Sequence, residues 1–178
     1  MSSAFLEPAP GFDQPIAVLK HCHDRIRRQI GTMQRLVPHL QKHGADLEAQ
    51  QAASAVLRYF SEAAPKHHAD EEVDLLPALR DIADGDDADT LRRLEPEILR
   101  EHQQMDVLWN MLRPVLAAIA AGENTPLPET VLGPFSEMYL AHMVKEETVI
   151  APMARRLLNP ARIARIGDAM RARRGITA

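Results

Sequence analysis

The sequence predicts an all-α protein, an antiparallel up-down four-helix bundle followed by a short fifth helix. Aromatic residues make up 4% of the chain, and helix-forming Ala, Leu, Arg and Glu are abundant, which favours helix over sheet. Apolar residues recur at spacings of three and four along four long segments. Short connections between these segments force neighbouring helices to run antiparallel. With 178 residues and 46% hydrophobic residues, the chain is large enough for one well-packed domain.

The first two long helices have clear ends. Residues 1–14 contain prolines and a glycine without helical periodicity, so we expect an extended N-terminal lead-in, with one domain over residues 15–178. The first helix is predicted over residues 15–43 and stops at Gly44. The second is predicted over residues 46–83 and stops in an acidic turn.

The remaining helices are bounded by the same kinds of start and stop residue. The third is predicted over residues 89–121 and stops at Gly122. The fourth begins somewhere within residues 125–134 and ends near residue 158. Asn159 is suited to cap a helix with Pro160 at its first position, which predicts the short fifth helix over residues 160–173.

Charge and composition exclude several classes of protein. The formal net charge is −4 and the 21 basic residues are dispersed, unlike the basic surface of a nucleic-acid-binding protein. The single cysteine, Cys22, cannot form an intramolecular disulfide, and the first residues lack the pattern of a secretory signal. No apolar run reaches the ~20 residues that span a bilayer. We therefore expect a cytoplasmic protein that binds neither nucleic acid nor membrane.

A single histidine interrupts the apolar stripe of the first and third helices. His23 replaces an apolar residue in the first stripe, and His102 does so in the third. The first stripe comprises Ile16, Leu19, His23, Ile26, Ile30 and Met33, and the third comprises Leu94, Ile98, His102, Met105, Trp109, Leu112, Leu116 and Ile119. Alone, such a histidine is more often a hydrogen-bonded core residue than a ligand.

The second and fourth helices each carry His-x-x-x-Glu on the stripe. The second contains His67 and Glu71, and the fourth contains His142 and Glu146. Each glutamate is followed six residues later by a proline, so the chain reads as two copies of a helix pair. Residues four apart lie one turn above each other on the same face, so each motif can present both side chains to one centre.

Burying four imidazoles and two carboxylates in one core layer costs several kcal/mol unless they are paired or bind metal. Imidazole nitrogen and carboxylate oxygen are both good iron ligands, and bundle cores build metal clusters from facing helices. The pattern therefore predicts two iron ions held by six inward side chains, which are His23, His67, Glu71, His102, His142 and Glu146.

Alternatives remain at neighbouring positions. His68 and Glu72 form a second i,i+4 pair one residue along, although the stripe phase favours His67 and Glu71. Glu147 raises the same ambiguity in the fourth helix, and Cys22 adjoins a predicted ligand but points off the stripe. Tyr139 lies on the stripe one turn before its histidine, where it packs or supports the ligands.

These residues resemble the hemerythrin-like HHE cation-binding family from residue 15 to residue 175. The matching segments are HDRI around His23, HHADEEVDLLP from His67, EH at His102 and HMVKEETVIAP from His142. The resemblance implies a non-haem di-iron centre bridged by an oxo or hydroxo group. It also implies that the four histidines are terminal ligands and that Glu71 and Glu146 are bridges.

The sequence departs from the oxygen-carrying members of that family. They have a second histidine on the third helix, where this chain has Asp106, and His-x-x-x-x-Asp on the fourth helix. Fewer ligands leave coordination positions open on both metals. The chain is therefore similar to four-histidine relatives associated with oxygen, nitric oxide or peroxide response and with iron-sulfur centre repair.

Three functions follow as expectations. The first is a di-iron binding protein that binds or senses oxygen, nitric oxide or iron. The second is a di-iron enzyme that reduces nitric oxide or decomposes peroxide, with Tyr139 or Asp106 as proton donor. The third is a scaffold whose buried polar groups pair only with one another. Metal analysis separates the third from the other two.

Overall fold

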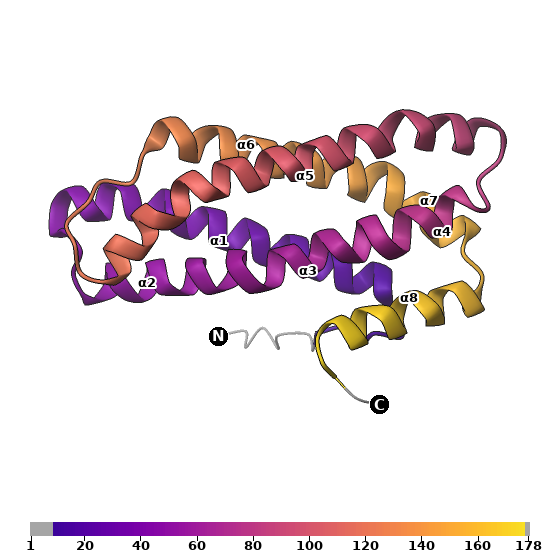
Figure 1. The fold of residues 1–178 in the computed structure, drawn as a ribbon, viewed down its shortest axis with the longest axis horizontal. Coiled ribbons are helices and arrows are strands. Elements are labelled where there is room, and N and C mark those ends of the chain that lie inside the picture. The colour runs from indigo at the N-terminus through magenta and orange to yellow at the C-terminus, as the bar shows by residue number, and fades with distance from the viewer. Residues whose placement is uncertain (1–8, 177–178) are drawn as a thin grey trace, which may run out of the picture.

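The computed structural model describes residues 9–176, and every regular element in that range is helical (Figure 1). Four long helical segments lie side by side along the longest axis, and consecutive segments run in opposite directions (Figure 1). A short fifth helix, α8 (Pro160–Arg173), packs beneath one end of the bundle (Figure 1). The predicted all-α bundle with a fifth helix is confirmed.

The first long segment has its predicted range, and the second ends at residue 80, before the predicted residue 83. The first is α1 (Pro15–His43), which ends at Gly44 with a φ of 66°. Asp46 caps the second, because its side chain accepts a hydrogen bond of 2.9 Å from the Ala49 amide. The second segment consists of α2 (Leu47–Arg58), η1 (Tyr59–Ala63), α3 (Ala64–Ala69), η2 (Asp70–Leu75) and α4 (Leu76–Arg80).

The third long helix begins earlier than predicted. Helix α5 (Gly85–Ala120) starts four residues before the predicted residue 89, so that boundary was wrong. Asp84 is extended and occupies the N-cap position, while Asp86 and Asp87 lie in the first turn. Negative charge near a helix N-terminus is stabilised by the helix dipole, so the acidic segment begins a helix instead of forming a separate turn.

The fourth segment begins within its predicted interval, and the fifth helix has its predicted bounds. The fourth consists of α6 (Glu129–Lys145), η3 (Glu146–Ile150) and α7 (Ala151–Leu157). Helix α8 (Pro160–Arg173) is capped by Asn159, whose side chain accepts a 2.9 Å hydrogen bond from the Arg162 amide.

Three segments of wider π-helix, named η1, η2 and η3, interrupt the second and fourth long helices. Each ends two residues before a proline, which is Pro65, Pro77 or Pro152. Proline has no amide hydrogen, and its ring collides with the carbonyl four residues earlier. A π-turn shifts the hydrogen-bond ladder and accommodates the ring. The prolines six residues after Glu71 and Glu146 thus accompany wider turns at the predicted ligand positions.

The core has two apolar halves separated by a polar layer. One apolar cluster includes Ile26, Phe60 and Phe135, and the other includes Ile16, Leu75 and Ile150. The layer between them contains the buried polar side chains His23, His67, His68, Asp70, Glu71, His102, His142 and Glu146. The layer crosses all four long helical segments, so it can form one centre in the middle of the bundle.

Helix α8 is fixed to the bundle at the level of the polar layer. Both carboxylate oxygens of the fully buried Asp70 accept hydrogen bonds from Arg174, and Arg173 also binds this carboxylate. The segment 9–14 forms no helix, and its Phe12 carbonyl lies directly over Gly167 of α8. The rest of the predicted lead-in, residues 1–8, lies outside the described residues.

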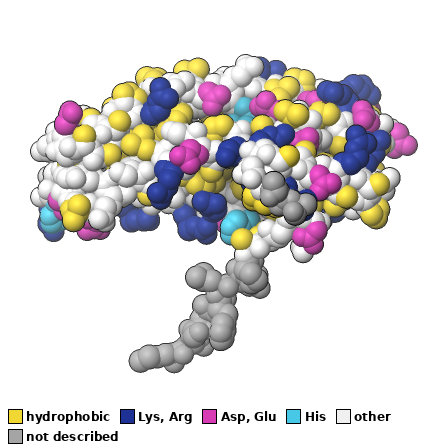
Figure 2. All heavy atoms as spheres, turned by 60° about the horizontal axis from the view of Figure 1, so that its bottom comes forward, with side chains coloured by type: hydrophobic (Ala, Val, Ile, Leu, Met, Phe, Trp, Pro, Cys, Tyr) yellow, Lys and Arg dark blue, Asp and Glu magenta, His cyan; other side chains and the backbone are white. Residues whose placement is uncertain are grey.

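The outer surface has mixed character. Basic, acidic and apolar side chains are interspersed on the face shown in Figure 2. Among residues 9–176, no helix combines the length and the apolar character needed to cross a membrane.

Candidate metal centre

All six side chains predicted as ligands meet in the polar layer. They come from α1, α3, η2, α5, α6 and η3, and each of their residues is at most 5% exposed. Together they make two overlapping groups whose donor atoms lie within 4.8 Å of one another. The first group is His23, His67, Glu71 and Glu146, and the second is Glu71, His102, His142 and Glu146.

Glu71 belongs to both groups because its two oxygens face opposite histidine pairs. Its Oε1 lies 3.3 Å from Nε2 of His67 and 3.8 Å from Nε2 of His23. Its Oε2 lies 3.5 Å from Nε2 of His102. One carboxylate can therefore contribute one oxygen to each of two neighbouring ions.

Glu146 repeats this arrangement from the fourth long segment. Its Oε2 lies 3.1 Å from Nε2 of His23, and its Oε1 lies 3.2 Å from Nε2 of His142. On the side of the second group, Nε2 of His102 and Nε2 of His142 are 3.0 Å apart. The geometry pairs His23 with His67 and His102 with His142, an assignment that the sequence left open.

The hydrogen bonding of the layer fits a metal better than a self-contained polar network. Within the described residues, no hydrogen-bond partner reaches Nε2 of His23, Oε2 of Glu71 or Oε2 of Glu146, and all three atoms are buried. Glu146 Oε2 is near His23 but is not aligned for a hydrogen bond. Buried polar atoms are costly when they stay unpaired. Nitrogen and oxygen donors that converge without partners are suited to a metal ion.

Three outer carboxylates hold three of the histidines in the orientation that a metal requires. Nδ1 of His23 lies 3.0 Å from Glu147, whose carboxylate also accepts two hydrogen bonds from Arg27. Nδ1 of His142 lies 2.8 Å from Glu101, which also binds Lys145. When Nδ1–H donates to a carboxylate, the Nε2 lone pair is directed inward, as in many metal sites.

His102 has the third outer carboxylate, and His67 has none. Nδ1 of His102 lies 2.5 Å from Glu72. Among the described residues no partner reaches Nδ1 of His67. The outer carboxylates were not predicted in this role, although Glu72, Glu101 and Glu147 each adjoin a predicted ligand in the sequence.

The neighbouring residues His68 and Glu72 lie outside the two groups. The ring of His68 is buried and stacks on His102, with ring centroids 3.9 Å apart and an interplanar angle of 9°. The Tyr139 hydroxyl lies 3.4 Å from Nε2 of His68. Burial, and then the charge of His102, hold the pKa of His68 well below its ordinary value, so this ring is neutral. His68 therefore packs as a neutral ring against the predicted ligand His102.

Three other residues considered from the sequence also lie outside both groups. Cys22 is half-buried, and burial raises its pKa to about 11, so its thiol is protonated at neutral pH. Asp106 is exposed. Tyr139 is buried and its hydroxyl is directed to His68, while burial and then the charge of Asp106 hold its pKa well above its ordinary value.

Two of the inward histidines hold protons tightly. Burial disfavours the charged form of His23, but the negative charges of the nearby Glu146 and Glu71 outweigh burial and raise its pKa to about 10. The same opposition between burial and the two carboxylates raises the pKa of His142 to about 9. Both rings are therefore cationic at neutral pH when no metal is bound.

The pKa values of the other four inward groups shift in different directions. Burial and the charge of His142 lower the pKa of His102 to about 3, and burial and His23 hold that of His67 well below its ordinary value. Burial and the charge of Glu146 raise the pKa of Glu71 to about 8. Burial opposes ionisation of Glu146 too, but the close imidazoles of His142 and His23 hold its pKa well below the ordinary value. A cation can replace the protons on this centre.

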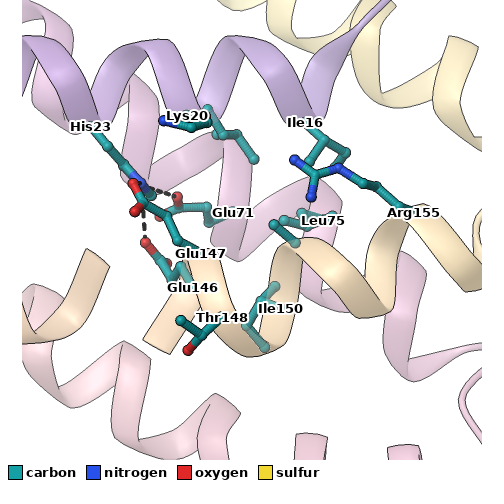
Figure 3. A pocket seen from close by; sticks show the side chains of 12 residues that line it. Ile16, Lys20, His23, Glu71, Leu75, Glu146, Glu147, Thr148, Ile150 and Arg155 are labelled. Carbon is teal, nitrogen blue, oxygen red and sulfur yellow. Dashed lines mark hydrogen bonds and ion pairs between the residues drawn. The ribbon is translucent and has the colours of Figure 1, made fainter. Parts of the chain in front are cut away.

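A cavity of about 350 Å³ reaches the first group from outside the bundle. It lies between α1, η3 and α7, and its inner wall includes His23, Glu71 and Glu146 (Figure 3). The rest of the wall combines apolar side chains, among them Leu75 and Ile150, with the polar or charged side chains of Lys20, Glu147, Thr148 and Arg155. The cavity gives small molecules a route to the His23 side of the centre.

Comparison with known proteins agrees with this geometry. Residues 14–154 match the family described as the Hemerythrin HHE cation binding domain, and this range contains all six inward residues. The chain is also 28% identical over 165 residues to an uncharacterized protein of Haemophilus influenzae, covering 93% of this chain and 92% of that one. With a helical bundle and buried His/Glu groups able to hold a metal, the chain belongs to the hemerythrin HHE cation-binding family.

Proposed function

We propose that this protein holds two iron ions in the polar layer and binds a small exogenous ligand there, such as oxygen or nitric oxide. The observation that carries the proposal is the sharing of Glu71 and Glu146 between two histidine pairs. His23 and His67 would hold one ion, and His102 and His142 the other, with both carboxylates as bridges. The bound ions would supply Lewis-acid and redox chemistry at the centre.

The number of protein donors supports binding of an exogenous ligand. Each ion would receive two imidazole nitrogens and one oxygen from each bridging carboxylate. Non-haem iron sites built from histidine and carboxylate keep positions open for exogenous ligands. The cavity beside His23 leads to this side of the centre, and its apolar lining suits small neutral molecules.

The surrounding residues keep the centre ordered and dry. Glu147, Glu72 and Glu101 fix the rings of three histidines from outside. The two apolar clusters exclude water above and below the layer.

A second candidate, enzymatic reduction of nitric oxide or peroxide, needs a proton donor at the centre. Tyr139 directs its hydroxyl to His68, and Asp106 is exposed. Neither side chain belongs to the inward groups. Ligand binding is therefore the better-supported function, and turnover assays with both compounds test the alternative.

The test begins with metal analysis of the protein reconstituted anaerobically with ferrous iron. We expect two irons per chain, and near-ultraviolet charge-transfer bands that change when oxygen, nitric oxide or azide is added. His39→Gln is the matched control, because His39 pairs with Asp46 far from the layer. His39→Gln should retain both irons. Substoichiometric iron in the wild-type protein, or spectra indifferent to all three ligands, would contradict the proposal.

A further inference from the structure

The cavity beside the centre is larger than a diatomic ligand requires. Its volume of about 350 Å³ falls within the ~300–1,000 Å³ of small-molecule binding sites. Between its inner end and the surface, the wall carries the aliphatic side chains of Ile16, Leu19, Leu75 and Ile150. These side chains come from α1, η2 and η3, so they enclose an apolar channel on several sides.

Two cationic side chains line this cavity. Lys20 is largely exposed, and the ion pair found for it is a long contact of 3.7 Å with Asp24. Arg155 is exposed and makes no ion pair with any residue of the described range. Figure 3 shows its side chain reaching back from α7 toward Ile16 and Leu75 on the opposite wall. Arg155 thus brings an unpaired cation to an apolar channel.

The charge changes sign along the cavity. Figure 3 shows Arg155 near Ile16 and Leu75 at one end of the cavity, whereas the carboxylates of Glu71, Glu146 and Glu147 lie near His23 at the other end. A fully polar anion would meet those carboxylates if it moved inward. An amphiphilic anion suits the cavity better, because its head group can stay with Arg155 while its tail covers the aliphatic wall.

We propose that this cavity binds a medium-chain alkyl carboxylate, with the carboxylate on Arg155 and the tail against Leu19, Leu75 and Ile150. The tail occupies the route from the surface to His23, so a bound acid restricts access to the centre. The proposal depends on the cavity and not on iron, and it therefore stands apart from the proposed function.

The probe is octanoate, titrated calorimetrically into the full chain in metal-free and iron-loaded form. Octylammonium has the same tail with the opposite charge, and propionate has the same head with a short tail. We expect saturable binding of one octanoate per chain in both forms, and much weaker binding of the other two. Equal binding of octanoate and octylammonium, or no saturable octanoate binding, would overturn the proposal.

Two variants locate the bound acid. Arg155→Ala removes the exposed cation and should weaken octanoate binding on the order of fivefold, the effect of losing one exposed ion pair. Arg156→Ala is the matched control, since Arg156 pairs with Asp87 and does not line the cavity. Ala151→Phe places a ring in the cavity and should abolish binding. Equal affinities of the Arg155 and Arg156 variants would contradict the assigned head-group site.

The two proposals fail separately. Iron content and charge-transfer spectra test the metal centre, whereas octanoate affinity of the metal-free protein tests the cavity. A protein that binds octanoate but no iron would retain this inference and lose the proposed function. A protein that binds two irons but no octanoate would do the reverse.

Discussion

Replacing Glu71 by glutamine tests whether one carboxylate serves two metal ions. Its Oε1 faces His23 and His67, and its Oε2 faces His102, so its loss damages both groups. His67→Gln is the comparison, because His67 belongs to the first group alone. We expect two irons per chain in the wild-type protein, one in His67→Gln and fewer than one in Glu71→Gln.

Both variants should fold without metal. Burial and the charge of Glu146 raise the pKa of Glu71 to about 8, so the metal-free protein carries a protonated carboxyl at neutral pH, which glutamine imitates. The pKa of His67 is held well below its ordinary value, mainly by burial, so a neutral side chain replaces a neutral one. Differences between the variants therefore report on metal binding more than on the metal-free fold.

The expected stabilisation by metal follows from linkage. One site saturated at 100 times its Kd stabilises the fold by ~2.7 kcal/mol. A chain of this size gains roughly 2–4 °C in Tm per kcal/mol, so each site contributes about 5–11 °C. The measurement is the Tm of each protein with and without iron, alongside its iron content. If Glu71→Gln keeps the iron content and the metal-dependent Tm shift of His67→Gln, the shared-carboxylate geometry is wrong.

Three further predictions follow from the surroundings of the centre. Glu101→Gln should weaken metal affinity about 10–100-fold in chelator competition, because Glu101 orients a histidine. Glu97→Gln should change the affinity little, since among the described residues the side chain of Glu97 binds Lys145 and no histidine. Equal affinities of the two variants would exclude this role of Glu101. Metal affinity should rise between pH 6 and pH 9. The pKa values of His23, His142 and Glu71 are raised to about 10, 9 and 8, so these groups must lose protons before they can bind a metal. A flat profile of affinity against pH in buffered titrations would refute this. Gly167→Ala should lower the free energy of unfolding by about 1–3 kcal/mol in urea denaturation, because the new methyl group would lie 1.9 Å from the Phe12 carbonyl oxygen. Gly133→Ala, with open space around it in α6, should raise the free energy of unfolding by about 0.4–1 kcal/mol. An unchanged stability of Gly167→Ala would show that the contact with Phe12 is not maintained in solution.

The sequence was sufficient to predict the four long helical segments, the fifth helix and the side of each helix that faces the core. A helix repeats every 3.6 residues, so the apolar stripe determines which side of each helix faces the core. His23 and His102 occur in phase with such stripes, and they are buried as that phase requires. The same phase favoured His67 over His68, and His67 lies in one of the two groups whereas His68 lies in neither. The start of α5 was missed because an acidic segment is suited both to a turn and to the first turn of a helix.

The tertiary structure alone decided which side chains meet across helices. It paired His23 with His67 rather than with His102, placed Glu101 against His142, and opened a cavity on one side of the centre. Local periodicity determines where a side chain points relative to its own helix axis. Its partner on another helix depends on the rotation and axial offset of the two helices, which are set by packing of the whole core.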